Sequence, residues 1–204
     1  VRFWGFNLTF GANFPDHDDA EKAAAHLAKL GVNAVRIHHH DTNPAPRGIL
    51  GPVADGRRVL DAGQLDRQDF FLNELNRRGI YANLNLHVGR EFTEAEGFPS
   101  TGPSRSVRYD KYLLYFEPRM REAFKGFCRD YLTHENPYRH LRRVDDPGIA
   151  MIEITNENSF SRLGPDIAAD LPEPYRGEFK GQWNAWLARD YADTASLRKA
   201  SLAI

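Results

Sequence analysis

The stretch Pro147–Ser159, PGIAMIEITNENS, joins a short apolar run to an abrupt polar ending. The apolar run follows Pro-Gly and predicts a buried strand over residues 149–155. Asn156 and Glu157 then stand at its C-terminal tip, where α/β barrels keep their chemistry. A carboxylic acid at that place suits a general acid that donates a proton to a leaving oxygen. The alternative is a strand that runs into an ordinary polar loop.

The rest of the chain alternates predicted strands with predicted helices. Strands are expected at 3–9, 33–39, 80–88 and 149–155, and helices at 18–30, 65–78, 118–133 and 177–191. This order predicts a parallel sheet with crossover helices. Long segments follow the second and third strands, so the longest loops are expected at the carboxyl ends of the strands, as in a catalytic barrel. The first strand is not followed by Gly-x-Gly-x-x-Gly, so a dinucleotide fold would lack its phosphate cradle.

Each predicted strand has one polar and one apolar face, because side chains alternate along a strand. The polar faces carry Asn7, then Arg36, His38 and His40, then Asn83, Asn85 and His87, then Glu153, Thr155 and Glu157. Four polar faces that point into one space predict a polar barrel interior near its mouth, with the apolar faces turned towards helices. An open doubly wound sheet would need both faces apolar.

The composition is that of an ordinary globular protein. The 204 residues are 41% hydrophobic and 27% charged, with a formal net charge of -1, and we expect one domain over 1–204. The balanced charge gives no reason to expect nucleic acid or a membrane surface as a partner, and no apolar run approaches the ~20 residues of a membrane helix. The basic cluster 139–143 is expected at the solvated surface. Cys128 is the single cysteine and is expected to be a small core residue.

Four segments of the chain resemble, in order, the clan A glycoside hydrolases and, within them, the family 5 cellulases and mannanases. They are Gly5–Asn7 (GFN), Leu30–Arg36 (LGVNAVR), Arg78–His87 (RGIYANLNLH) and Ile152–Asn158 (IEITNEN). The resemblance implies a (β/α)8 TIM barrel, of which this chain carries about the first four β/α units. It also implies retaining hydrolysis of a β-linked glucan or mannan without a cofactor. Secretion or a periplasmic location is compatible with the resemblance, but the residues do not fix the compartment.

The resemblance also implies roles for individual residues. Glu157 would be the acid/base, and Asn156 would contact the sugar next to the scissile bond. The other positions implied to bind sugar are Arg36, His87, His39, His40 and Asn7. An arginine inside a barrel must be paired, and Glu153, one layer below Glu157, is its expected partner. That pair could equally be purely structural.

Two further features leave alternatives open. The run His38 to Asp41, with His87 from the next strand, would suit a zinc or iron site in a metal-dependent hydrolase or oxygenase. The family resemblance instead explains these histidines as hydrogen-bonding groups for sugar hydroxyls, and we expect no metal. One or two of the aromatic residues after the strands could stack on sugar rings, the candidates being Phe92, Phe98, Tyr109, Tyr112, Tyr115, Phe116 and Phe160.

The chain departs from the family in one important respect. Retaining hydrolysis needs two carboxylates about 5–5.5 Å apart, and in the family the nucleophile is a glutamate after the seventh strand. Glu153 cannot replace it, because four residues along a strand span roughly 13 Å. Glu91 is geometrically conceivable but matches no family motif. We therefore expect the nucleophile on a missing C-terminal half, in cis or in another chain. A fragment that binds carbohydrate without turning it over is the alternative.

Overall fold

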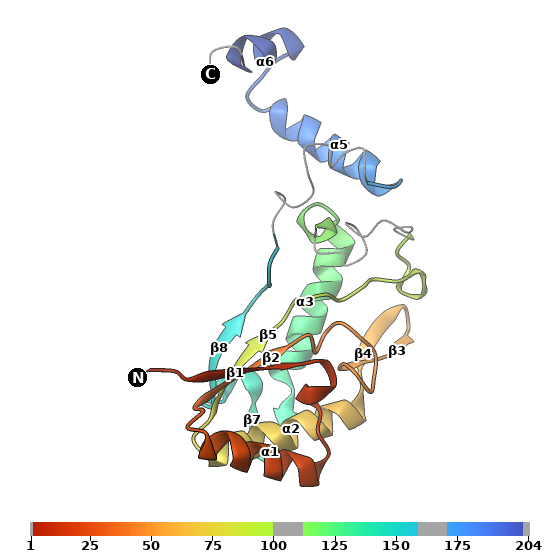
Figure 1. Cartoon of the computed structure of the whole chain (residues 1–204). Coiled ribbons are helices and arrows are strands. Elements are labelled where there is room, and N and C mark those ends of the chain that lie inside the picture. The colour runs from red at the N-terminus through yellow and green to blue at the C-terminus, as the bar shows by residue number, and fades with distance from the viewer. Residues whose placement is uncertain (1, 100–111, 159–170, 202–204) are drawn as a thin grey trace.

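A parallel sheet with helices packed on one of its faces forms the centre of the molecule (Figure 1). A computed structural model describes residues 2–99, 112–158 and 171–201. The strand order is β1 (Gly5–Thr9), β2 (Ala34–His38), β5 (Tyr81–Asn85) and β8 (Ile149–Glu153), and all neighbours are parallel. The predicted order of strands and helices and the parallel pairing are confirmed.

Three helices cover the apolar side of this sheet. They are α1 (His17–Lys29), α2 (Ala62–Arg77) and α3 (Pro118–Thr133). Asp16 and Asp61 begin α1 and α2 as N-caps, each accepting a backbone N–H at 2.9 Å, and Pro118 opens α3. Gly31 and Gly79 follow the first two helices with φ of 77° and 74°, a conformation that glycine adopts without strain.

The main core lies between these helices and the sheet. It joins Val35 and Ile37 of β2 and Ala82 and Leu84 of β5 to apolar residues of the helices, among them Leu27, Phe71, Leu75, Phe127 and Tyr131. These strand residues have the parity that the sequence predicts. The opposite face of the sheet therefore carries the polar side chains.

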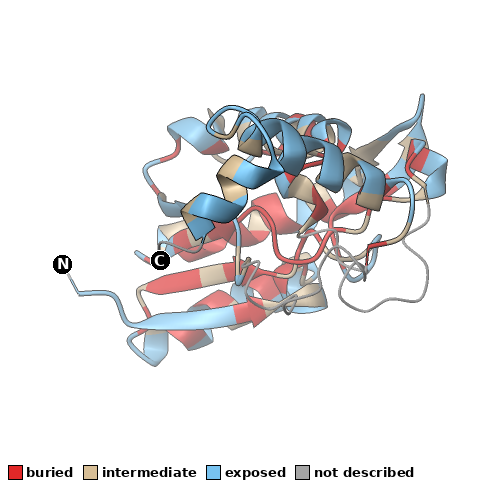
Figure 2. Ribbon diagram, turned by 90° about the horizontal axis from the view of Figure 1, so that it is seen from above, coloured by how far each residue is buried: buried red, intermediate tan, exposed pale blue. Residues whose placement is uncertain are grey.

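The two outer strands differ from the prediction that every apolar face is turned to a helix. Figure 2 shows β1 exposed along most of its length, and Trp4 and Phe6 are 68% and 49% exposed. On the other edge, Ile152 and Ile154 are 41% and 68% exposed. The reason is topological: each edge strand lacks a neighbour on one side, and no helix of the described residues covers these faces.

The long segments contain small elements that sequence periodicity did not predict. A hairpin, β3 (Leu50–Ala54) and β4 (Arg57–Leu60), follows β2, and a short ribbon, β6 (Glu135–Asn136) and β7 (Leu141–Arg142), follows α3. Single 3-10 turns lie at Phe10–Asn13 (η1), Glu94–Glu96 (η2), Leu113–Tyr115 (η3) and Arg143–Asp145 (η4). Two helices end the described chain, α5 (Tyr175–Leu187) and α6 (Thr194–Ser201). Among the described residues no helix has the length and apolarity to cross a bilayer.

A second apolar cluster lies beyond the start of α3. It contains Phe92, Phe98, Leu113, Phe116, Met120, Leu171 and Tyr175, with Phe179 of α5 packed against it. Gln182 donates to the backbone oxygen of Phe116, and the rings of Phe116 and Phe179 are 5.4 Å apart. The N-terminal half of α5 is thereby held at the start of α3, while Trp183 and Trp186 are half exposed.

The expectation that the basic cluster 139–143 is solvated is wrong for two of its arginines. Arg143 is 2% exposed and donates to Asp69 at 2.6 Å, and Arg139 binds both oxygens of Asp146. Burial of an arginine requires such a partner, because an unpaired buried charge is very costly.

Candidate functional site

Arg36 is the centre of a charged cluster on the polar face of the sheet. Its guanidinium binds Glu153 bidentately, at 2.8 Å from Nε and 2.6 Å from Nη2, and Nη2 also donates to Asn156 Oδ1 at 2.8 Å. The Arg36 and Glu153 side chains are 28% and 31% exposed. The predicted ion pair is therefore present, and its arginine also binds the side chain of Asn156. Two parallel N–H···O bonds fix orientation as well as distance.

Glu157 lies beyond β8 and does not continue its alternation. The strand ends at Glu153, and Glu157 is exposed with a φ of 49°. Because the strand ends at Glu153 and Glu157 has left-handed backbone, parity with Glu153 does not decide where Glu157 points, and its inward orientation stays a prediction. Left-handed backbone is uncommon for a residue with a side chain, and it concentrates at functional sites.

His87 ties the end of β5 to the segment before Glu157. Its backbone oxygen accepts the Asn156 N–H at 2.9 Å, and its Nδ1 lies 3.2 Å from Thr155 Oγ1. The side chain is fully buried and its ring lies 5.1 Å from that of Phe124. His87 thus contacts both Thr155 and Asn156, the two residues that precede Glu157. Through Asn156 it is linked to the Arg36 cluster.

His38 and His40 are engaged with Asn85 instead of converging on a metal. His38 Nδ1 lies 3.2 Å from Asn85 Nδ2, so this ring nitrogen accepts, and His40 Nε2 donates to the Asn85 backbone oxygen at 2.7 Å. Burial, with a smaller effect of Arg36, lowers the pKa of His38 to about 4, and burial also lowers the pKa of His40. In the described part of the chain, no three His, Cys, Asp or Glu side chains are grouped to hold a metal.

His39 and Asn7 lie at the margin of the cluster. His39 has a φ of 55° and stacks on Phe10, whose φ is 50°, with ring centroids 4.5 Å apart. Arg47 lies over the same Phe10 ring, 5.0 Å from its centroid. Asn7 is exposed and is the register partner of Arg36 on the neighbouring strand. His40, by contrast, is fully buried, so it lies beneath the surface of the site.

Asp41 is a residue whose role the sequence did not reveal. It is fully buried, and its Oδ2 accepts the backbone N–H groups of Val88, Gly89 and Arg90 at 2.8, 3.2 and 3.2 Å. The carboxylate thereby fixes the chain directly after His87. The run HHHD drew attention to Asp41 in the sequence, but it suggested a metal ligand and not a residue that binds the backbone.

The aromatic candidates divide by burial. Phe92, Phe98 and Phe116 belong to the second apolar cluster, so they cannot serve as exposed platforms. Tyr115 is 45% exposed, and its hydroxyl donates to the backbone oxygen of Asn158 at 3.1 Å, next to Glu157. Tyr112 is half-buried, and Tyr109 and Phe160 lie outside the described residues.

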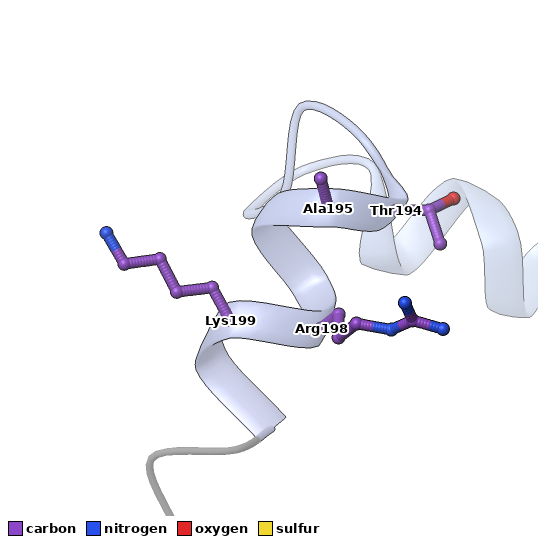
Figure 3. Close-up of a pocket in the computed structure, with 4 residues that line it drawn as sticks. All are labelled: Thr194, Ala195, Arg198 and Lys199. Atoms are coloured by element: carbon purple, nitrogen blue, oxygen red, sulfur yellow. The ribbon is translucent and has the colours of Figure 1, made fainter.

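Two surface hollows lie away from this cluster. One, of about 540 Å³, is lined by Thr194, Ala195, Arg198 and Lys199 of α6 (Figure 3), at the far end of the molecule in Figure 1. Four residues of one short helix cannot enclose a ligand. The other, of about 230 Å³, lies at the opposite ends of β5 and β8, beside Tyr81 and Gly148. In barrels, chemistry belongs to the carboxyl ends of the strands, so neither hollow competes with the Arg36 cluster.

No protein-family profile and no curated protein sequence matches the chain. Solved structures do match. The endo-1,4-beta-mannanase from Rhizomucor miehei aligns over 76% of this chain and 43% of its own, with 20% identity and a TM-score of 0.59. A glycoside hydrolase family 5 mannosidase from the same organism aligns over 81% of this chain and 47% of its own, with 16% identity and a TM-score of 0.58.

A third match is the hyperthermostable endo-1,4-beta-D-mannanase from Thermotoga petrophila, with 17% identity and a TM-score of 0.56 over 77% of this chain and 45% of its own. The chain spans less than half the length of each of these structures. Identity at this level establishes the fold alone. The chain therefore has the fold of part of a family 5 glycoside hydrolase barrel.

Proposed function

We propose that this chain supplies the acid/base half of the active site of a retaining β-glycosidase that acts on a β-linked mannan or glucan. Glu157 would protonate the leaving oxygen and then activate water. The observation that carries the proposal is the bond from Arg36 to both Glu153 and Asn156, directly before Glu157. The matched structures, named as mannanases and a mannosidase, support the substrate class.

The Arg36 cluster orients a sugar-binding amide. Because Asn156 Oδ1 accepts from Arg36, its amide nitrogen is turned to the other side. An amide held in this way can donate to a sugar hydroxyl with little loss of side-chain entropy on binding. Arg36, in turn, is fixed by the two oxygens of Glu153. In this proposal Glu153 is a positioning residue that does not touch the reacting bond.

The backbone at Glu157 supports a catalytic role for this carboxyl. A left-handed conformation costs free energy, and the surrounding contacts must hold it. The bond from Asn156 N to His87 O and the contact of Thr155 with His87 Nδ1 hold the preceding residues against β5. Glu157 is exposed, so a substrate oxygen can reach it.

The proposal requires a second carboxylate from outside this chain. Glu153 is bound bidentately by Arg36, and the mechanism needs a carboxylate about 5–5.5 Å from the acid/base. The exposed outer faces of β1 and β8 are the surfaces that further β/α units would cover. This chain covers only 43% and 45% of two of the matched structures, which is consistent with such units. A polypeptide that completes the barrel is thus the proposed partner.

The test is turnover by the complete reading frame that contains residues 1–204, measured on mannan and glucan oligosaccharides. Glu157→Gln should lower the rate of glycosylation about 10²–10⁴-fold, the usual contribution of general acid catalysis. Substrates with good leaving groups should lose less, because they need less protonation. Glu94→Gln is the control, since Glu94 is an exposed carboxyl in η2.

Two outcomes would count against the proposal. Equal losses for activated and unactivated substrates would remove Glu157 from the acid role. Binding of oligosaccharide without turnover in the complete protein would instead identify a carbohydrate-binding fragment.

A further inference from the structure

Two buried carboxylate oxygens without a hydrogen-bond partner lie where α5 meets the start of α3. Glu117 is the N-cap of α3: its Oε1 accepts the Arg119 N–H at 2.8 Å, and its side chain is 1% exposed. Glu178 lies in the first turn of α5, directly before Phe179, whose ring packs against Phe116, the residue before Glu117. Oε2 of Glu117 and Oε2 of Glu178 are both buried and meet no donor. Two ionised carboxylates cannot bond to each other, because both are acceptors only.

We propose that Glu117 and Glu178 form a proton-binding carboxylate pair that fastens α5 to the start of α3, and that α5 is released as the pH rises. The shared proton supplies the donor that the two orphan oxygens lack. It also removes the repulsion between two like charges at close range.

The neighbouring contacts place the pair at the junction itself. Phe116 and Phe179 are the adjacent residues of the two elements, and their rings lie 5.4 Å apart. Gln182, one turn further along α5, donates to the Phe116 backbone oxygen. Tyr175, the first residue of α5, donates to the backbone oxygen of Pro99 at 2.7 Å. These contacts hold the first two turns of α5 beside the residue that precedes Glu117.

A proton fits this junction better than a metal cation does. Ca²⁺ takes six to eight oxygen ligands, and two carboxylates do not provide them. No third His, Cys, Asp or Glu in the described ranges joins the pair. The basic residue that faces it is Arg119 of α3, whose Nε lies 3.4 Å from Glu117 Oε1 and whose side chain is 57% exposed. That position neutralises Oε1 of Glu117 and leaves its Oε2 without a donor.

The direction of the pH effect follows from the environment. Burial, and then the charge of Glu117, raises the pKa of Glu178. A carboxyl whose folded-state pKa is raised contributes stability that is present below its unfolded value of about 4.3 and is lost as the pH rises through the folded value. Each unit of displacement corresponds to about a tenfold change in the docking equilibrium.

Hydrogen exchange of the 204-residue chain between pH 4.5 and 8 tests the proposal. Protection factors, which are corrected for intrinsic exchange, should fall about tenfold or more in residues 175–187 as the pH rises, while β5 stays protected. Glu178→Gln provides a permanent amide donor, so docking should become independent of pH. Glu21→Gln, at an exposed site on α1, should behave like the unmodified chain.

An NMR titration of the unmodified chain tests the proposal without relying on the variants. The ¹³C resonance of the Glu178 carboxyl should titrate above the ordinary glutamate range in the unmodified chain. Protection of α5 that does not change with pH, or an equal pH dependence in the Glu178→Gln chain, would overturn the proposal. So would docking at pH 8 that depends on added Ca²⁺ and is abolished by a chelator, since that would identify a cation in place of the proton.

Discussion

Replacement of Asp41 by asparagine should destabilise the chain and loosen the segment that follows His87. Asp41 is fully buried, and one of its oxygens accepts three backbone N–H groups, from Val88, Gly89 and Arg90. Hydrogen bonds to a charged group contribute about 1.5–3 kcal/mol each, and neutral ones about 0.5–1.5 kcal/mol. Loss of the charge should therefore cost roughly 1 kcal/mol per bond. The expected total is about 2–3 kcal/mol, since the three bonds share one oxygen.

Urea unfolding of the 204-residue chain measures this cost. With a slope of about 2 kcal/mol per molar urea, typical of small proteins, the midpoint should fall by roughly 1–1.5 M. Amide exchange at residues 88–90 should rise more than exchange in α1, because the lost bonds are local. Asp61→Asn is the matched control: Asp61 caps α2 through a single N–H, and asparagine is an equally good N-cap. A midpoint for Asp41→Asn that equals that of Asp61→Asn would refute the reasoning.

Three other predictions concern the cluster and the open edges. A double-mutant cycle with Arg36→Met and Glu153→Gln should give a coupling free energy of about 1 kcal/mol in urea unfolding, because both side chains are about 30% exposed and solvent screens them. A coupling free energy of zero would show that the ion pair does not stabilise the fold. Since burial lowers the pKa of His38 to about 4, the free energy of unfolding should fall as the pH drops from about 6.5 towards 4. His38→Asn should remove most of that slope, and a His38 ring that titrates near 6.5 by NMR would contradict it. The isolated chain should self-associate with concentration, and Phe6→Ser with Ile154→Ser should reduce this in analytical ultracentrifugation, because both side chains expose apolar area at the sheet edges. An unchanged association constant would exclude these faces as the contact.

The pattern of the sequence determined the order and pairing of the main elements. Alternation with period two assigned Val35, Ile37 and Leu84 to the core and Arg36 to the polar face, and the structure confirms this. The same reasoning paired Arg36 with Glu153 across 117 residues, because an arginine expected inside a barrel needs a carboxylate on a face that it can reach. Helix α3 begins and ends at the predicted residues, since Pro118 marks its first turn. Local periodicity and capping suffice for such features.

Tertiary structure alone decided the features that depend on backbone breaks and distant partners. The left-handed backbone of Glu157 ends the alternation of β8, and no local pattern in the sequence predicts such a break. Arg143 can be buried because it forms an ion pair with Asp69, 74 residues away in the sequence. Asp41, which follows another strand, accepts hydrogen bonds from the backbone of residues 88–90. The exposed faces of the edge strands follow from sheet order. Each of these features depends on which distant segments come into contact in the folded chain. The interaction energy of such a contact involves both segments, so neither segment's sequence predicts it alone.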